Sequence, residues 1–433
     1  MQLDSAKQLI QGFGINDTWA EKAVPSAAFS TTAADGIGLS ILRIGMSDTG
    51  SDYTSSIFTS DIASIKAVSG KVIGSCWSPP ANCKDSGTIN DGGHLLSSCY
   101  GSWSDKMVTW AKGHSLYAMS IGNEGDFKSC GTTEPCNGNY PTTLYTANEM
   151  VAFVKVAGPK LQAAGIKVIA GEASEWIHTW SNESATGSDP GKKNSSDPLK
   201  CGFPATTKCN DGSGYDYGHW LAKDADAWKA FDILGVHEYD TQHAEPWPSD
   251  VTAAKKEVWQ TEMSGVKWWP EQGPSSDINN GIAVAGWVHS ALAVGDASAW
   301  LWWWYAPLSS GTNDNEGLVL QGSTAWTKRY YTIGNYSKFV RPGYTRVDMT
   351  GSTTDLLLSA YKGTDGTVVI VAINKGTAAT VPITISGGTA PASCTPNVTS
   401  SSDNLKAGTA VAVTGGSFTA SLAATTVTTF VCK

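Results

Sequence analysis

Eight short apolar segments, each followed by a stretch long enough for a helix, recur along this chain up to residue 304. Each is bounded by Gly, Pro, Asn or Asp and is rich in β-branched or aromatic residues, which is typical of buried strands. The segments are residues 9–14, 39–45, 71–77, 116–123, 167–172, 231–237, 257–261 and 299–304. Amphipathic stretches such as 145–164 and 280–293 lie between them. Eight strands alternating with helices predict an α/β fold, a (β/α)8 TIM barrel.

After about residue 338 the sequence changes to a period-two alternation without helical stretches. Strand candidates at 356–361, 368–374, 381–385 and 426–431 are rich in Val, Ile and Thr and are separated by Gly-, Ser- and Thr-rich turns. This pattern predicts an antiparallel β-sandwich. We therefore divide the chain into a catalytic barrel, residues 1–337, and a side domain, residues 338–433.

The ends of the barrel strands carry the candidate functional residues, because active sites of TIM barrels lie at the C-terminal ends of their strands. These ends are unusually polar and aromatic: Arg43, Trp77, Asn123, Glu124, Glu172, His237, Tyr239, Glu262, Trp302 and Trp303. If the strands lie side by side, Glu124 and Glu262 project into one mouth. Two carboxyl groups facing each other across a sugar-sized gap are the minimal equipment for cleaving a glycosidic bond. A single glutamate at a strand end is more often a surface or salt-bridged residue, but the pair predicts a glycoside hydrolase.

The chemistry of that reaction gives the neighbours of the two glutamates expected roles. Glu124 has to be protonated to give its proton to the leaving oxygen, so we expect burial and the charge of Glu262 to raise its pKa. Arg43 would keep Glu262 ionised, although a purely structural ion pair is an equal alternative. Tyr239 would donate a hydrogen bond to the same carboxylate. Asn123 would hold the sugar 2-hydroxyl, an interaction that strengthens in the transition state.

The aromatic residues at the strand ends have two interpretations. Trp77, Trp302 and Trp303 would stack on sugar faces, where a flat apolar ring meets axial C–H groups. They could equally be core residues, and the alternation of side chains along a strand predicts that one or two of the tryptophans at 302–304 are buried in the core.

Three further residues at or near the strand ends have a structural explanation as well as a functional one. Glu172 and Asp126 are expected to position a ligand or a loop rather than to carry the chemistry. His237 is placed with the substrate-binding residues. Together with Glu238 and His243 it suggests a metal site, but no further ligand recurs at a suitable spacing, so we expect neither a metal nor a cofactor.

Composition restricts the kind of partner. Charged residues make up 16% of the chain, Trp reaches 18, and the net charge is -9 without any Lys/Arg block, which argues against nucleic acid. The balance suits a secreted protein that handles neutral, hydroxyl-rich ligands, and we expect this protein to be a monomer. No run of 18 apolar residues occurs, so we expect no membrane span. The chain starts without a signal peptide, which we interpret as a mature or recombinant form.

Nine cysteines are many for a cytosolic enzyme, and most fall into locally spaced pairs. We expect four disulfides, Cys83–Cys99, Cys130–Cys136, Cys201–Cys209 and Cys394–Cys432. The remaining cysteine, Cys76, lies inside a strand segment and is expected to be a buried thiol. Their spacing does not match a structural zinc site.

Several motifs of this chain resemble glycoside hydrolase family 30, and most closely its bacterial glucuronoxylan-cleaving xylanase branch, subfamily 8. They are Gly12-Phe13-Gly14, Trp77-Ser78-Pro79-Pro80, Ser120-Ile121-Gly122-Asn123-Glu124, Leu234-Gly235-Val236-His237-Glu238-Tyr239, Thr261-Glu262, Trp302-Trp303 and Tyr336 to Tyr344. The resemblance implies a barrel fused to a β-sandwich whose first strand comes from the N-terminus. It also implies a retaining mechanism with Glu124 as acid/base and Glu262 as nucleophile.

Two positions depart from the family pattern. Gly125 stands where the family usually has Pro after the acid/base, which is expected to reshape the loop and leave the chemistry intact. The glucuronoxylanase branch also carries an Arg after the eighth-strand aromatics, whereas here no Lys or Arg follows Tyr305 until Lys328. Loss of such a carboxylate contact removes about 1.5–3 kcal/mol of recognition. Lys267, on another loop, could supply the charge instead.

The sequence therefore predicts a secreted, retaining endo-β-1,4-xylanase that hydrolyses plant cell-wall xylan or xylooligosaccharides without strict dependence on glucuronic acid. Open alternatives are a glucuronoxylan-specific xylanase, an exo-acting xylobiohydrolase and another family 30 β-glycosidase such as a β-1,6-glucanase. A non-catalytic carbohydrate-binding protein is the most distant alternative.

Overall fold

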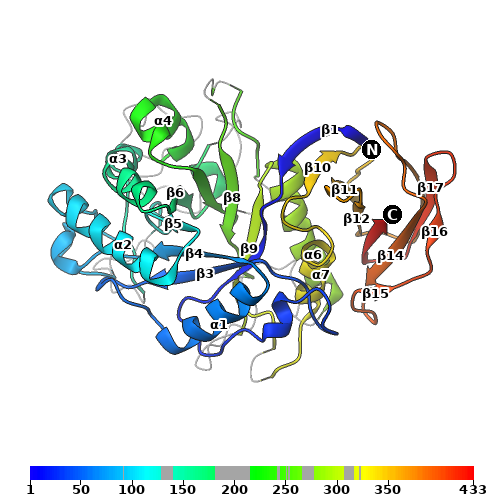
Figure 1. The fold of residues 1–433 in the computed structure, drawn as a ribbon, viewed down its shortest axis with the longest axis horizontal. Helices are drawn as coiled ribbons and strands as arrows, with labels where there is room; N and C mark the ends of the chain where they lie inside the picture. The colour runs from blue at the N-terminus through cyan, green and yellow to red at the C-terminus, as the bar shows by residue number, and fades with distance from the viewer. Residues whose placement is uncertain are drawn as a thin grey trace.

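The computed structural model describes residues 1–90, 92–127, 140–180, 215–240, 244–249, 251, 254–265, 277–306, 316–320 and 323–433. Figure 1 shows two bodies side by side, a barrel surrounded by helices and a β-sandwich that carries both chain ends. The predicted fold class, a TIM barrel with an appended antiparallel β-sandwich, is confirmed. No described helix is both long and apolar enough to cross a membrane.

The barrel consists of eight parallel strands that close in the order β2 to β9. They are β2 (Gly12–Asn16), β3 (Ile41–Met46), β4 (Lys71–Cys76), β5 (Ala118–Ser120), β6 (Lys167–Ala173), β7 (Ile233–His237), β8 (Glu257–Glu262) and β9 (Ala299–Trp304). A layer of inward side chains fills the barrel: Ile41, Ile73, Ala118, Ile169, Ile233, Trp259, Ala299 and Leu301. Because both faces of these strands are buried, they read as continuous apolar runs in the sequence.

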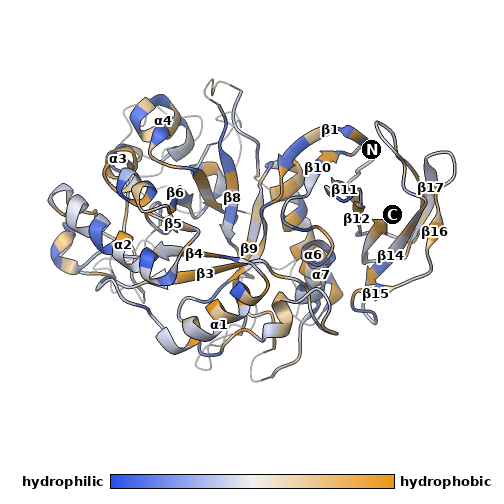
Figure 2. Ribbon diagram, viewed as in Figure 1, coloured by the Kyte–Doolittle hydropathy of each residue, from blue (hydrophilic) through white to orange (hydrophobic). Residues whose placement is uncertain are grey.

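Helices cover the outside of the barrel. They are α1 (Ser55–Ala67), α2 (Tyr100–His114), α3 (Ala147–Ala163), α4 (Tyr217–Lys223), α5 (Ala225–Lys229), α6 (Ile278–His289) and α7 (Lys328–Ser337). In Figure 2 strands such as β3 are largely hydrophobic, whereas α2 and α3 alternate hydrophilic and hydrophobic segments, as expected for helices with one face on the barrel. Helix α3 begins with a capping box in which Thr146 and Glu149 satisfy each other's backbone N–H groups.

The first predicted strand, residues 9–14, spans the boundary between two strands. Strand β1 (Gln2–Leu9) pairs antiparallel with β10 (Thr345–Asp348) of the side domain, and β2 of the barrel begins three residues later, at Gly12. At Gly12 φ is +140°, and a Cβ there would lie 2.2 Å from the Ser40 hydroxyl oxygen. Only glycine fits this passage from one domain to the other.

The side-domain sheet runs in the order β1-β10-β11-β12-β18-β14-β15, with β16 paired to β14, and a second pair, β13-β17, faces it. Its strands are β11 (Leu356–Lys362), β12 (Val368–Asn374), β13 (Ala379–Thr384), β14 (Ser393–Thr399), β15 (Lys406–Ala407), β16 (Val411–Ala412), β17 (Ser417–Leu422) and β18 (Thr426–Cys432). The domain docks on the barrel through α7, where the buried Asn335 donates to the Asn397 carbonyl at 3.1 Å and its carbonyl accepts from Thr429 at 2.6 Å.

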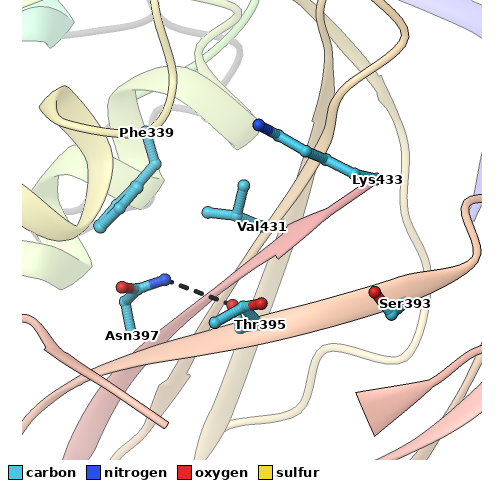
Figure 3. Close-up of a pocket in the computed structure, with 6 residues that line it drawn as sticks. All are labelled: Phe339, Ser393, Thr395, Asn397, Val431 and Lys433. Atoms are coloured by element: carbon cyan, nitrogen blue, oxygen red, sulfur yellow. Dashed lines mark hydrogen bonds between the residues drawn. The ribbon is translucent and has the colours of Figure 1, made fainter. Parts of the chain in front are cut away.

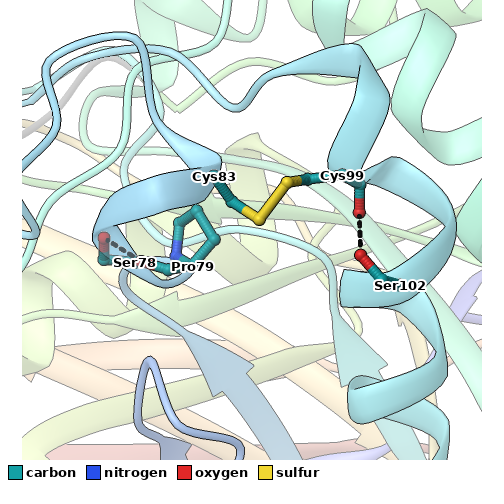
Figure 4. The surroundings of a disulfide bond; sticks show 5 residues. All are labelled: Ser78, Pro79, Cys83, Cys99 and Ser102. Atoms are coloured by element: carbon teal, nitrogen blue, oxygen red, sulfur yellow. Dashed lines mark hydrogen bonds between the residues drawn. A yellow bond between two sulfur atoms is a disulfide. The ribbon is translucent and has the colours of Figure 1, made fainter.

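Two of the four expected disulfides lie in the described residues and are formed: Cys83–Cys99, between the loop after β4 and the start of α2 (Figure 4), and Cys394–Cys432, between β14 and β18. Cys76 is a buried free thiol, as expected. The expected pairs Cys130–Cys136 and Cys201–Cys209 lie outside the described residues.

An open depression of about 370 Å³ lies beside the end of α7. Figure 3 shows the side chains that line it. Phe339 forms one side of it, and the rest comes from β14 and from the end of β18, namely Ser393, Thr395, Asn397, Val431 and Lys433. Its lining belongs to the side domain and its junction, so it is separate from the mouth of the barrel.

Candidate active site

The structure brings the two predicted glutamates together at one end of the barrel. Glu124 follows β5, and Glu262 is the last residue of β8. One carboxylate oxygen of each residue and one ring nitrogen of His237, the last residue of β7, all lie within 4.8 Å of one another. Glu124 is 7% exposed and Glu262 is 5% exposed, so both carboxyl groups are largely shielded from water.

The backbone at this end departs from regular strand geometry. Glu124 and Glu172 have positive φ values of 46° and 47°, which non-glycine residues rarely adopt. Glu172 lies at a register shift between Gly171 and Ala173 on β6, and its carbonyl accepts a hydrogen bond from the Glu124 N–H at 2.9 Å. Backbone conformations of this kind cost free energy and concentrate at functional sites, where surrounding structure holds them in place.

Glu262 is held by two donors, one from β3 and one from the loop after β7. Arg43, on β3, donates from its NH1 group to Glu262 Oε2 at 2.6 Å, and Tyr239 donates its hydroxyl to Oε1 at 2.9 Å, so the expected hydrogen bond from Tyr239 is present. The same guanidinium donates to Asn123 Oδ1 at 2.6 Å and lies 3.3 Å from Glu172. Arg43 therefore fixes Glu262, Asn123 and Glu172 from the interior of the barrel.

Glu124 sits in an environment that favours its neutral form. Burial and then the charge of Asp126 raise its pKa to about 8, while Arg43 opposes the rise. Glu172 and Glu175 add further negative charge. We expected Glu262 to be the charge that raises this pKa, but Asp126, two residues along the same loop, has the larger effect. A carboxyl group with such a pKa is protonated at neutral pH and can act as an acid.

Most of the charged groups around Glu262 favour its ionised form. Burial raises its pKa as well, but His237 and Arg43 both oppose the rise, and Glu124 is the only carboxylate among the leading causes. Two oxygens that accept hydrogen bonds from Arg43 and Tyr239 favour the ionised form. The pKa of both carboxyl groups is raised, but Glu262 alone accepts hydrogen bonds from Arg43 and Tyr239, as suits the group that has to be ionised.

His237 and Glu172, both predicted to bind substrate, are fully buried beneath the two glutamates. The His237 ring nitrogen Nδ1 lies 2.9 Å from Glu124 Oε1, and burial lowers the pKa of this imidazole. Glu172 accepts hydrogen bonds from Ser75 at 2.8 Å and Ser120 at 2.6 Å. In these positions the two residues contact other side chains of the site rather than the open mouth.

Asp126 is part of a second buried network next to Glu124. Its carboxylate accepts hydrogen bonds from the Ser174 N–H at 2.8 Å and the Ser174 hydroxyl at 2.7 Å, and it lies 2.6 Å from His178 Nδ1. These contacts lower the pKa of Asp126 against the effect of burial, so it stays charged. The network places a fixed negative charge beside the candidate acid.

Gly125, the departure after the acid, is explained by two tyrosines. A Cβ at this position would lie 2.9 Å from Tyr145 Cδ2 and 3.0 Å from the Tyr217 hydroxyl. The Gly125 carbonyl accepts from the Tyr145 N–H at 2.8 Å. In this chain the loop that carries Glu124 packs directly against Tyr145, and glycine makes that contact possible.

An aromatic cluster lies at the mouth of the barrel. Trp77, Trp303 and Trp304 form its buried part, and Trp19, Tyr53 and Tyr140 pack against them. We refer to these six residues as the mouth cluster. The ring centroids of Trp77 and Trp303 lie 6.0 Å apart, and Trp19 lies 5.2 Å from Trp77. Arg43 lies over the Trp77 ring at 4.9 Å, which connects the cluster to the Glu262 carboxylate.

Trp302 does not belong to the mouth, and its predicted contact with substrate is not supported. Its side chain is fully buried in the main core, its Nε1 donates to the Glu316 carbonyl at 2.8 Å, and Arg329 lies 5.3 Å from its ring. Side chains alternate along β9, so Leu301 points into the barrel while Trp300 and Trp302 point outward under the helices. The side chain of Trp303, the next residue, points to the inner side of the barrel again.

Several residues of the site were not found from the sequence. Trp19 and Tyr140 belong to the mouth cluster, His178 supports Asp126, and Glu316 lies close enough to Glu262 for its pKa to rise. Trp19 lies three residues after the end of β2, and an aromatic residue at that point is a signal that could have been used. His178 ends a short 3-10 helix and the other two lie in loops, whose course the strand pattern does not predict.

The atoms of Glu124, His237 and Glu262 are close enough together to bind a cation. However, both oxygens of Glu262 already accept hydrogen bonds, and one of the donors is the guanidinium of Arg43. A metal ion would have to displace a buried positive charge, so we assign these residues no metal. His243, considered with them, lies outside the described residues.

Comparison with known proteins matches residues 343–430 to the glycosyl hydrolase family 30 beta sandwich domain. A Bacillus subtilis (strain 168) protein named Glucuronoxylanase XynC is 30% identical over 456 aligned positions, which cover 100% of this chain and 90% of that protein. Two solved structures cover all of this chain and 98% of their own. One is a family 30 endoxylanase from Clostridium papyrosolvens (26% identity, TM-score 0.76). The other is a family 30 subfamily 8 xylanase from Clostridium acetobutylicum (25% identity, TM-score 0.78).

Proposed function

Because this chain belongs to glycoside hydrolase family 30, we propose that it is a retaining endo-β-1,4-xylanase that cleaves xylan by double displacement. The observation that carries the proposal is the pair Glu124 and Glu262, with carboxylate oxygens within 4.8 Å of each other and charged surroundings that differ. Retaining enzymes hold their two carboxyl groups about 5–5.5 Å apart, whereas inverting enzymes need about 6.5–9.5 Å to admit a water molecule. The names of the xylanase relatives support xylan as the substrate class.

In the first step Glu262 Oε1 or Oε2 attacks the anomeric carbon, and the bond from that carbon to the glycosidic oxygen breaks. Glu124 gives its proton to the departing oxygen, which leaves as the hydroxyl of the shortened chain. Arg43 and Tyr239 orient the attacking carboxylate from two sides. Asn123, whose Oδ1 is fixed by Arg43, can direct its amide N–H groups to the 2-hydroxyl.

In the second step Glu124 is ionised and acts as a base. It takes a proton from water, and the resulting hydroxide equivalent attacks the anomeric carbon and releases Glu262. The product keeps the β configuration because two inversions have occurred. Glu124 returns to its protonated form, in which burial and Asp126 stabilise it again.

We further propose that the enzyme does not require glucuronic acid side groups. No Lys or Arg occurs between Tyr305 and Lys328. The Lys328 ammonium group donates to the Asp403 carbonyl at 3.2 Å and to Asn404 Oδ1 at 2.7 Å, so it faces the side domain instead of the mouth. Lys267, the alternative source of charge, lies outside the described residues. Trp77 and Trp303 of the mouth cluster would provide apolar contact to neutral sugar rings.

Secretion and a monomeric state are parts of the same proposal. The disulfides Cys83–Cys99 and Cys394–Cys432 are typical of proteins that fold in an oxidising compartment. A polymeric substrate outside the cell fits this compartment.

A product profile tests the proposal. Glucuronoxylan and an unsubstituted linear xylan are digested at equal enzyme concentration, and the oligosaccharides are separated by size and charge. We expect comparable cleavage of both, with short neutral oligomers from the linear polymer. Cleavage of glucuronoxylan alone would refute independence from the side group, and release of xylobiose alone would indicate exo-action. No cleavage of either would refute a xylanase and direct the search to β-1,6-glucans.

A further inference from the structure

Glu316 is a carboxylate at the mouth that the proposed reaction does not use. Eleven residues separate it from the end of β9 in the chain, but its carbonyl accepts from Trp302 Nε1, on that strand, at 2.8 Å. The following residue, Gly317, forms a β-bridge with Trp304, and the Leu318 N–H donates to the Tyr305 carbonyl at 2.8 Å. These contacts hold the backbone of Glu316 against the end of a barrel strand, so the position of its Cα atom is fixed.

The Glu316 carboxylate shares its surroundings with the nucleophile. Burial and then the charge of Glu262 raise its pKa to about 7. Burial, with the charges of Glu124 and Glu262, raises the pKa of Tyr140, of the mouth cluster, and of Tyr239, and the charge of Glu316 adds a smaller rise to both. Glu262, Tyr239 and Tyr140 come from β8, from the loop after β7 and from the segment before α3. The Glu316 carboxylate is therefore near enough to the nucleophile for the two charges to influence each other.

Within the part of the chain that the structure describes, no side chain or backbone group donates a hydrogen bond to this carboxylate and no cation pairs with it. The side chain is only partly buried. A partly buried carboxylate without a protein partner has its oxygens available to accept hydrogen bonds from water or from a ligand. Sugar hydroxyl groups are suitable donors, whereas a second carboxylate would meet an uncompensated negative charge.

We propose that Glu316 is a specificity-determining residue that accepts hydrogen bonds from a neutral sugar and excludes sugars with an acidic side group from this part of the cleft. The inference rests on the proposed function and deepens it. The absence of Lys and Arg between Tyr305 and Lys328 removes an attraction for an acidic side group of the sugar, and the charge of Glu316 adds a repulsion.

The ionisation of Glu316 gives the proposal a pH signature. A carboxyl group with a pKa of about 7 is mostly neutral at pH 5.5 and mostly charged at pH 8, whereas a glucuronate side group is charged throughout this range. The facing tyrosines, Tyr140 and Tyr239, have raised pKa values and stay neutral. Glu124 and Glu262 also titrate, but both act on every substrate, so their effect cancels in a ratio of two substrates.

The experiment compares kcat/KM for two xylooligosaccharides of equal length, one neutral and one with a single glucuronate group, at pH 5.5 and pH 8. In the wild type we expect the ratio of neutral to acidic substrate to rise on the order of tenfold between the two pH values, which corresponds to about 1.4 kcal/mol. In Glu316→Gln the ratio should be lower at pH 8 and independent of pH. Asp226→Asn, which removes one exposed charge on α5, is the control and should behave as the wild type.

Two results would overturn the inference: a wild-type ratio that does not change with pH, or a Glu316→Gln ratio equal to that of the wild type at pH 8. The wild-type pH series decides the matter even if the variant fails to fold, which circular dichroism would reveal. If the wild type cleaves neither substrate, the proposed function fails and the inference fails with it. If the wild type cleaves both substrates but the ratio of their kcat/KM values does not change with pH, only the inference is refuted and the proposed function stands.

Discussion

The two ends of strand β8 carry a glutamate each, and their surroundings differ completely. Glu257, at the start of the strand, is partly exposed and accepts hydrogen bonds from Gln11 at 2.7 Å and Trp259 at 2.9 Å. Glu262, at the end, is buried, pairs with Arg43 and lies beside a second carboxyl group. The same residue type on one strand is thus a structural hydrogen-bond acceptor at one end and a candidate nucleophile at the other.

The difference shows that the site is formed by several charged residues that meet at one end of the barrel, and not by any single residue. Parallel strands bring their C-terminal ends to one side of the barrel, so charged groups from β3, β5, β6, β7 and β8 meet there. Burial then makes each charge depend on its neighbours, because water no longer screens them.

The largest effect is expected for Glu262→Gln, which removes the nucleophile and keeps the shape of the side chain. Turnover of xylan should fall on the order of 10⁶-fold, as when a catalytic nucleophile is removed elsewhere. The matched control is Glu257→Gln on the same strand, which should keep its activity and lose at most about 1 kcal/mol of stability. Initial rates and thermal melts of both variants are the measurements. Equal activity of the two variants would contradict the assignment.

A somewhat smaller effect is expected for Glu124→Gln, because protonation assists departure of the leaving group without forming the new bond. Hydrolysis of xylan should fall about 10²- to 10⁴-fold. An aryl xyloside with an acidic phenol needs little protonation, so formation of the intermediate from it should be much less impaired. Rates on the two substrate types separate the roles, and an identical loss on both would count against Glu124 as the acid.

Asp126→Asn should change the pH profile rather than abolish activity. In the wild type, activity should decline as pH rises through about 8, because Glu124 then loses the proton it must donate. Asp126→Asn removes the largest charge that raises this pKa, so the alkaline limit should move to lower pH. The exposed Asp105→Asn, which loses an ion pair with Lys160, is the control. An alkaline limit that stays in place would show that Asp126 does not tune Glu124.

The smallest effects should distinguish two neighbouring tryptophans. Trp303→Phe, in the mouth cluster, should raise KM by about two- to tenfold through a loss of about 0.5–1.5 kcal/mol of stacking. Trp302→Phe, in the core, should lower the melting temperature and leave KM unchanged, because its ring faces the helices. Michaelis constants and melting curves of the pair are compared. The opposite pattern would place Trp302 in the cleft after all.

The sequence predicted the barrel because strands that are buried on both faces leave continuous apolar runs separated by helical stretches. It predicted Glu124, Glu262, Arg43, Asn123 and Tyr239 at one end because strand order implies that their ends meet. It misplaced the first strand, since residues 9–14 connect two domains, and it could not choose between Trp302 and Trp303 without the register of β9.

The pattern of apolar strand segments does not predict where residues in loops lie. Asp126 was considered only for positioning, and its effect on the pKa of Glu124 depends on the burial of a network with Ser174 and His178. Glu316 is separated from β9 by eleven residues in the chain, and only the folded backbone places it beside Trp302. Such contacts depend on tertiary structure, which local propensity does not encode.

The stereochemistry of the first product tests the central claim most directly. Wild-type enzyme is mixed with a xylooligosaccharide, and proton NMR follows the anomeric signals before mutarotation. A Glu124 and Glu262 pair that works by double displacement predicts that the β-anomer appears first and the α-anomer grows in later. An α-anomer as the first product would mean a single displacement by water, and would contradict the role of Glu262 as a nucleophile.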